Sequence, residues 1–254
     1  MTIALNVPDF VGFLLALVRA GVWVTITPPL NNRSINRSVR AGLAAALALA
    51  ASHRLGAQLG PGPYDTLTLL NDAVVQAFVG ATLGVVAIIV FSAVASAGSY
   101  IDLFGGFTIS SAFDPFLNAQ NSVFGRLYEL VAIMLLFAIN GHLVLVEGFL
   151  HSFDAISLHA PKLNTIGQVL IRDLKIYLTA AVEIAAPLIA ALFLAQVTLG
   201  LLARAAPAMQ VFALSFPFTI LLTLLLAGMV ARMLPGEVRS VLDQVQQSFI
   251  ALTR

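Results

Sequence analysis

The sequence contains no cysteine and few charged residues. Of its 254 residues only 10% are Asp, Glu, Lys or Arg, and the formal net charge at pH 7 is +1. The absence of cysteine excludes disulfides, thiolate metal ligands and a cysteine nucleophile. A net charge near zero leaves no basic stripe for a polyanion, so nucleic acid is not expected as a partner.

The chain is rich in apolar residues. They make up 59% of the chain, whereas soluble domains have roughly 45–50%. One globule of this length is unable to bury so much apolar surface, so lipid or partner helices are needed around it. The length allows about six segments of the ~20 apolar residues that span a bilayer. The composition therefore predicts an all-α membrane protein.

Six apolar runs are separated by short polar connections. The second run is short and consists almost entirely of Ala and Leu, so we expect it to pack against other helices rather than face lipid. Gly80 and Gly84, four residues apart in the third run, favour close helix packing within or between subunits. These runs predict about six helical segments. They are Val11–Ile26, Ala41–Ala51, Ala73–Ala97, Leu130–Val146, Leu178–Leu202 and Val211–Ala231.

The sequence changes character after Pro235-Gly236. Apolar residues then recur on one helical face and polar residues lie elsewhere, which is the pattern of an amphipathic helix. We expect a helical membrane domain over residues 1–234 and an amphipathic C-terminal helix over residues 235–254. This helix would lie on the membrane surface or dock to a partner. Its apolar face consists of Val238, Val241, Leu242, Val245, Phe249 and Leu252.

Two charged residues and two prolines lie inside apolar runs. Arg19 and Glu183 are expected to face protein or water, because a charge in lipid costs at least ~2.5–3.5 kcal/mol. They form either a structural pair or interface, or part of an ion or proton pathway. Pro187 and Pro217 each remove a backbone donor and predict a bend or break, as in the cavity-lining helices of transporters. A proton- or ion-coupled secondary transporter of a small solute is therefore an alternative function.

No motif indicates a chemical step. The chain has no Gly-x-Ser-x-Gly elbow, no phosphate-binding loop and no dinucleotide fingerprint. His142 and Glu147 are five residues apart, which misses the i, i+4 spacing that puts two metal ligands on one helical face. A hydrolase that used His142, Glu147 or Asp154 would lack a nucleophile. We therefore expect no enzyme activity, no catalytic residue, no metal and no cofactor.

The stretch GSYIDLFGGFTISSAFDP, residues 98–115, lies between two apolar runs. Gly105 and Gly106 permit backbone conformations that other residues avoid, and Asp114 before Pro115 favours an extended or turn conformation. The stretch is expected to contain a loop or a broken helix. Its small and aromatic residues would pack into a narrow opening without a large desolvation cost. An ordinary surface turn between helices is the other interpretation.

Four blocks of the sequence, in order along the chain, carry a resemblance to a known family. They read LVRAGVWVTITPPL, AGSYIDLFGGFTISSAFDP, LLFAINGHLVL and IAAPLIAALFLAQVTLGLLARAAPAMQVFALSFPFT. The last is the most specific, because it joins a Leu-Gly-Leu-Leu-x-Arg-x-x-Pro run to a following Phe-Pro. With these blocks the chain resembles the FliR family of flagellar and type III secretion export-gate membrane subunits. It departs from the family at Asn36, often proline, at Gln76, often acidic, and at Ala208, often glutamine.

The resemblance implies a nonenzymatic subunit of the type III protein export gate in the bacterial inner membrane, at the flagellar basal body. Its apolar segments would be arranged as bent helical hairpins, which would sit beside those of other small membrane subunits, around a conduit for unfolded substrate proteins. The loop from Gly105 to Pro115 would help to plug this conduit, with Phe107 and Phe113 filling it. The implied pore or plug residues are Gly105, Gly106, Phe107, Ser110, Ser111, Phe113, Asp114 and Pro115. The structural or coupling candidates are Arg19, Glu183, Pro187, Arg204, Pro207 and Pro217.

Overall fold

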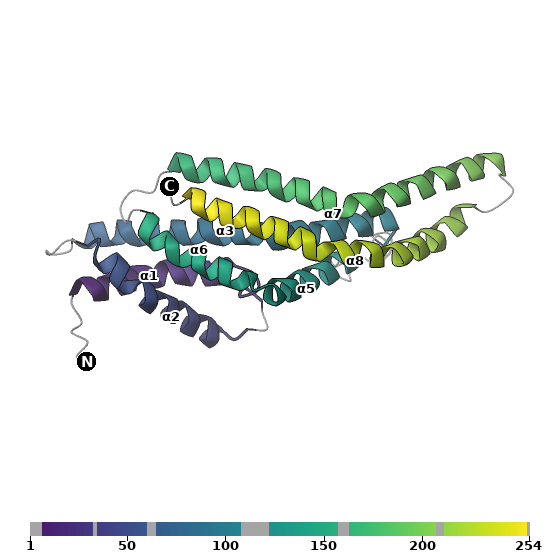
Figure 1. Cartoon of the computed structure of the whole chain (residues 1–254). Helices are drawn as coiled ribbons and strands as arrows, with labels where there is room; N and C mark the ends of the chain where they lie inside the picture. The colour runs from purple at the N-terminus through teal and green to yellow at the C-terminus, as the bar shows by residue number, and fades with distance from the viewer. Residues whose placement is uncertain are drawn as a thin grey trace. The chain divides into compact units, whose positions relative to one another are not determined.

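The computed structural model describes residues 7–32, 35–59, 65–107, 122–156, 163–206 and 211–252 (Figure 1). All regular structure within these ranges is helical, which confirms the expected all-α fold. The helices are α1 (Val7–Ile26), α2 (Arg37–Gly56), α3 (Thr66–Gly105), α5 (Val123–Ala138), α6 (Gly141–Ala155), α7 (Leu163–Ala205) and α8 (Val211–Leu252).

Four of these helices are long and apolar enough to cross a bilayer: α1, α3, α7 and α8. The broken pair α5 and α6 makes a fifth candidate if it forms one span. The described residues thus supply four or five candidate spans, where the sequence indicated about six. Helices α3, α7 and α8 contain 40, 43 and 42 residues. At 1.5 Å per residue each is about 60 Å long, roughly twice the ~30 Å thickness of the hydrocarbon core.

The chain packs into two compact units. The first consists of Met1–Ile89, Asn140–Leu174 and Leu242–Arg254, and the second of Val90–Ile139 and Lys175–Val241. The division between the units falls inside α3, α7 and α8, and between α5 and α6. At this last place Asn140 adopts the left-handed conformation with φ of 56°. Each unit has buried apolar residues of its own.

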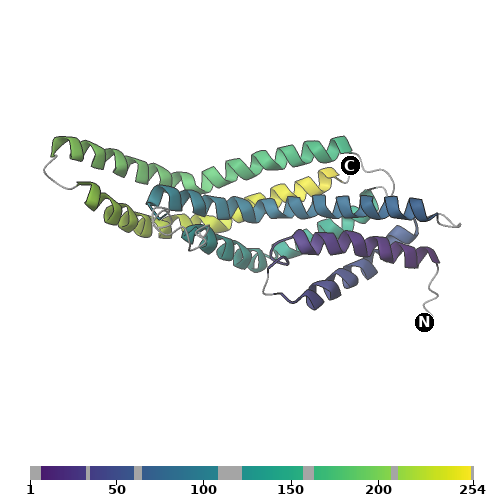
Figure 2. The same cartoon turned by 180° about the vertical axis from the view of Figure 1, so that it is seen from behind.

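Glycines bring helix backbones into contact in the first unit. Helices α1 and α2 lie side by side (Figures 1 and 2), and a Cβ atom on Gly12 would lie 2.7 Å from the backbone nitrogen of Gly56. Gly80 of α3 packs directly on the backbone carbonyl of Arg19, and a Cβ atom on Gly84 would lie 2.7 Å from the Ile26 side chain. The two glycines therefore serve packing within the subunit, which is one of the two uses that their spacing indicated.

The second unit joins parts of α3, α5, α7 and α8. Gly98 of α3 packs against the backbone of Phe124 and Gly125 at the start of α5, where a Cβ atom has no room. The hydroxyl groups of Ser96 and Tyr177 are 2.7 Å apart and connect α3 to α7. A Cβ atom on Gly105 would lie 2.7 Å from the Thr223 hydroxyl of α8. These contacts fix the end of α3 relative to its neighbours within the unit.

The C-terminal residues extend α8 instead of forming a separate helix. Helix α8 continues through Pro235 and ends at Leu252. All six residues of the expected apolar face are buried. Within the first unit, Phe249 packs on Gly148 of α6. The apolar face that seemed to need a membrane surface or a partner is thus covered by the chain itself.

Candidate functional site

A fully buried arginine connects three helices of the first unit. The Nε atom of Arg19, on α1, donates to the Gln76 side-chain oxygen of α3 over 2.7 Å. Its Nη1 atom donates to the backbone oxygen of Ser152, on α6, over 2.9 Å and to the Ser152 hydroxyl over 3.1 Å. The guanidinium carbon lies 4.3 Å from the centre of the Phe153 ring. Arg19, Gln76, Ser152 and Phe153 all have an exposed fraction of 0%.

These contacts support the structural interpretation of Arg19. The Trp23 ring of α1 stacks on the Phe149 ring of α6, with 4.5 Å between ring centres. A buried cation is costly unless its donors are satisfied. Neutral acceptors take Nε and Nη1 and the Phe153 ring covers the guanidinium, while Nη2 is buried without a hydrogen-bond partner among the described residues. Glu183 is exposed on α7 and is not among these partners. The interpretation of Arg19 as a buried structural group is therefore favoured over a relay that uses it.

A second polar cluster lies in the second unit, at the end of α3. The carboxylate of Asp102, 1% exposed, accepts from the backbone N–H of Phe124 over 3.0 and 3.2 Å, and from the Ser122 hydroxyl. Ser122 is the N-cap of α5, and its hydroxyl accepts from the backbone N–H of Gly125 over 2.7 Å. A carboxylate at this place satisfies free N–H groups of the first turn and interacts favourably with the helix dipole.

The cluster also includes Phe107, the last described residue before position 122. Its backbone N–H donates to the Asp102 carbonyl over 3.1 Å, and its ring packs edge-on against Phe124 with 5.4 Å between ring centres. We call Asp102, Phe107, Ser122 and Phe124 the loop-base cluster. It joins the end of α3 and Phe107 to Ser122 and the start of α5, which are the described residues on either side of positions 108–121.

Part of the predicted plug belongs to this region. Gly105 ends α3 and is buried, and Gly106 has φ of 81°, a conformation that favours glycine. The backbone conformation that the glycine pair predicted, one that other residues avoid, is therefore present at Gly106. Phe107 is half-buried. The other plug candidates, Ser110, Ser111, Phe113, Asp114 and Pro115, lie outside the described residues, as does Pro207.

An apolar cavity of about 330 Å³ adjoins the loop base within the second unit. It lies between the end of α3, the last turns of α7 and the first turns of α8. The Gln196 side chain, one of its polar groups, donates to the backbone oxygen of Phe104 over 3.0 Å. The lining residues are Leu103, Phe104, Gly106, Gln196, Leu199, Gly200, Ala203, Ser215, Phe216 and Thr219.

The remaining candidates lie on the surface of long helices. Glu183 and Pro187 are exposed on α7, Arg204 is exposed in its last turn, and Pro217 is exposed on α8. Neither proline ends its helix, since α7 and α8 continue on both sides. The helix breaks that these prolines suggested are thus absent at Pro187 and Pro217.

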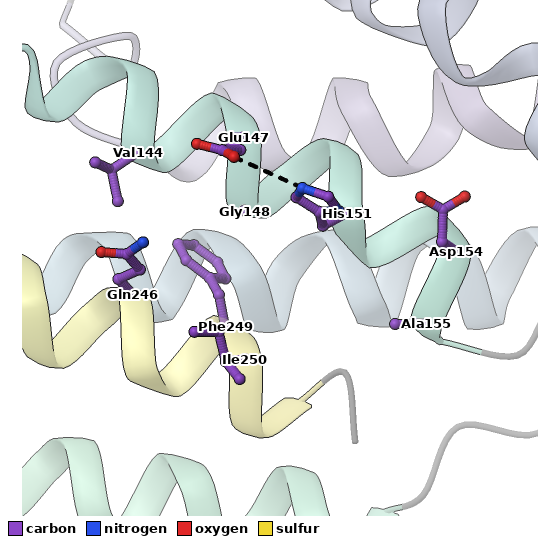
Figure 3. Close-up of a pocket in the computed structure, with 9 residues that line it drawn as sticks. All are labelled: Val144, Glu147, Gly148, His151, Asp154, Ala155, Gln246, Phe249 and Ile250. Atoms are coloured by element: carbon purple, nitrogen blue, oxygen red, sulfur yellow. Dashed lines mark ion pairs between the residues drawn. The ribbon is translucent and has the colours of Figure 1, made fainter.

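The acid and base groups of α6 border a larger cavity, of about 530 Å³, in the first unit (Figure 3). The Glu147 carboxylate lies 3.7 Å from His151, one turn further along α6, and Asp154 pairs with Arg54 at 2.6 Å. Sequence analysis missed His151, although its i, i+4 spacing from Glu147 was visible. Among the residues that the structure describes, no group of three His, Asp or Glu side chains is placed to hold a metal.

Long apolar helices in glycine-mediated contact, with an arginine buried among them, define a polytopic α-helical membrane protein. The sequence pattern of Bacterial export proteins, family 1, matches residues 10–245, so the chain belongs to this family. It is 29% identical over 215 residues to flagellar biosynthetic protein FliR of Bacillus subtilis, covering 83% of this chain and 82% of the relative.

Two further relatives come from other bacteria. Flagellar biosynthetic protein FliR of Escherichia coli K12 is 29% identical over 205 residues, which cover 80% of this chain and 78% of that protein. Yop proteins translocation protein T of Yersinia pestis is 34% identical over 164 residues, 60% of each chain. The flagellar relatives thus match a larger share of the chain than the translocation protein does.

Proposed function

We propose that this protein is a subunit of the type III protein export gate of the bacterial inner membrane. It forms part of the conduit for unfolded proteins and helps to plug it with the loop Gly105–Pro115. Membership of the export family supports the general function. The longer matches to flagellar relatives favour the flagellar basal body over an injectisome.

The loop-base cluster is the observation that carries the plug proposal. A plug must hold back ions yet yield to a polypeptide, so its ends need firm attachment while its own apolar contacts stay few. Asp102 provides the attachment through the Phe124 N–H and the Ser122 hydroxyl, and Phe107 adds its ring contact. The small and aromatic residues that follow Phe107, TISSAFDP, suit a narrow passage.

The exposed surface of α7 and α8 in the second unit supports a hetero-oligomer. Large apolar side chains there are strongly exposed, for example Leu194 at 65%, Leu201 at 64% and Leu225 at 70%. Because these helices are about twice as long as the hydrocarbon core is thick, lipid covers only part of their length. We infer that other small membrane subunits of the gate cover the rest.

The plug is tested by the double variant Phe107→Gly/Phe113→Gly in the assembled complex. Reconstituted in planar bilayers, this complex should conduct ions in the absence of substrate, because both aromatic groups that fill the passage are removed. Phe10→Ala, at an exposed aromatic residue of α1, is the control and should leave the bilayer sealed. Conductance of the double variant at the wild-type level would show that these residues are not the plug.

The subunit function is tested by purification from the membrane. A gate subunit should copurify with other small membrane proteins, whereas a secondary transporter should take up its solute when purified alone. The structure offers the transporter no support at Arg19, whose Nε and Nη1 donors are committed to Gln76 and Ser152. Recovery of a homogeneous chain without partners from mild detergent would overturn the proposal.

A further inference from the structure

An exposed carboxylate lies in the middle of the apolar helix α7. Glu183 belongs to the candidate span Asn164–Ala205, and its side chain is exposed. Within the part of the chain that the structure describes, no hydrogen bond or ion pair involves this side chain. A charge in such a position is expected to meet protein or water, because lipid provides nothing to solvate it.

Pro187 creates a second free acceptor at the same turn. It lies four residues after Glu183, and its ring nitrogen carries no hydrogen. The backbone carbonyl of Glu183 therefore lacks the donor that every ordinary residue at position 187 would supply. Glu183 thus contributes two acceptors to one place on α7, a charged carboxylate and a backbone carbonyl. Lipid chains have no donor for either of them.

The surroundings of Glu183 suit the close approach of another helix. Its exposed neighbours Thr179 and Ala186, one turn away on either side, are small, and so is the exposed Ala190, two turns after Glu183. Small residues at such spacing let helix backbones approach one another in membranes. On the other side of α7, the buried residues Ala181, Ile184, Ala185 and Leu188 pack inside the second unit. The face that carries Glu183 is therefore left open for a partner.

We propose that this surface, Thr179, Glu183, Ala186, Pro187 and Ala190, docks a helix of another membrane subunit that presents a lysine or arginine. The partner's cation would pair with the carboxylate, and one of its N–H groups would satisfy the freed carbonyl. This inference rests on the hetero-oligomer proposed above. A second copy is disfavoured, since a twofold contact centred here would bring two Glu183 carboxylates together.

The charge is tested in the complex as purified from the producing bacterium. Glu183→Lys places a cation against the partner's cation and should lower the recovery of copurified subunits by at least ~10-fold. Glu183→Gln keeps an acceptor and should lower it less. Asp243→Lys, at an exposed acid of α8, is the matched control and should recover wild-type amounts. Wild-type recovery for Glu183→Lys would overturn the inference.

The partner is identified with the wild-type carboxylate in place, so that the result does not depend on a variant's folding. A photo-crosslinking amino acid at position 186 should capture another membrane subunit, at a peptide that contains a lysine or arginine within about one helical turn. Replacement of this partner lysine or arginine by glutamate should restore the assembly of the complex that contains Glu183→Lys. Crosslinks confined to lipid or to a second copy of this chain would overturn the inference.

The two proposals fail in distinguishable ways. If the wild-type chain brings no membrane subunit with it, the hetero-oligomer itself is wrong. If the wild-type complex assembles but Glu183→Lys assembles equally well, only the docking surface is wrong, and the export function stands.

Discussion

The Nε atom of Arg19 donates to the side-chain oxygen of Gln76 over 2.7 Å, and both side chains are fully buried. The bond joins α1 to α3 at the level where Gly80 packs on the Arg19 carbonyl. Close packing and a polar contact thus occur at one crossing of the two helices. Because the described acceptors of Arg19 are neutral, the cation depends on each of them for its solvation inside the protein.

Removal of the Gln76 oxygen should therefore destabilise the first unit. We expect Gln76→Leu to lower the free energy of unfolding by about 2–3 kcal/mol, since the buried guanidinium loses an acceptor. Gln76→Glu should be at least as stable as the wild type, because the bond becomes charge-assisted. The measurement is thermal or denaturant unfolding of the purified protein in detergent.

Gln168→Leu provides the control for this series. Gln168 is exposed on α7, so its replacement should change the free energy of unfolding by less than about 0.5 kcal/mol. If Gln76→Leu and Gln168→Leu unfold alike, Arg19 does not depend on Gln76.

The contact between α3 and α5 depends on the missing side chain of Gly98. A methyl group there would overlap the backbone of Phe124 and Gly125 at the start of α5. Gly98→Ala should therefore cost about 1–3 kcal/mol, despite the better helix propensity of alanine. The midpoint of thermal unfolding should fall accordingly.

Gly200→Ala is the matched control, in an equally helical part of α7. A Cβ atom on Gly200 would meet nothing within 4 Å. Only the propensity gain of up to ~1 kcal/mol should then be observed. Equal effects of the two substitutions, in sign and size, would contradict the close approach at Gly98.

Residue spacing in the sequence predicted the helices, but it did not predict which helices pack against one another. Gly80 and Gly84 are four residues apart, so their common face and its need for a close neighbour follow from helix geometry alone. That the neighbour is α1 does not follow, and neither does the bond from Arg19 to Ser152, 133 residues away. Periodicity identifies the buried face of a helix but carries no information on which helix covers it.

The C-terminal boundary shows a different limit. The sequence pattern changes after Pro235 and Gly236 and predicted a distinct amphipathic helix over residues 235–254, and both residues disfavour helix. In the structure α8 continues through both. The apolar face beyond them, including Val238, Val245 and Phe249, is buried. Packing of this face outweighs the local cost, because tertiary contacts commonly override helix propensity.

The candidate site was only partly visible in the sequence. The pair Gly105-Gly106 predicted a backbone conformation that other residues avoid, and Gly106 has a positive φ of 81°. Asp102 is one of two charged residues in the stretch 98–115, and no motif there assigns it a function. Its function at the loop base depends on Ser122 and Phe124, which lie about twenty residues further along the chain. Ser110, Ser111, Phe113, Asp114 and Pro115 stay predictions of the resemblance.

Loss of the Asp102 carboxylate should release the loop base. Asp102→Ala leaves the Phe124 N–H and the Ser122 hydroxyl without their buried acceptor, which should cost about 1–3 kcal/mol. Hydrogen exchange at the amides of Phe124 and Gly125 should accelerate in consequence. Asp102→Asn keeps one oxygen and should have a smaller effect. The control is Asp243→Ala, at an exposed carboxylate of α8.

The same variants connect the loop base to the plug. If the anchors hold the plug in place, the assembled complex with Asp102→Ala should conduct more ions than the wild type, and Asp102→Asn an intermediate amount. Unchanged exchange at Phe124 in Asp102→Ala would contradict the attachment itself. Accelerated exchange with a sealed bilayer would show that the attachment is real and that the closure of the conduit does not depend on it.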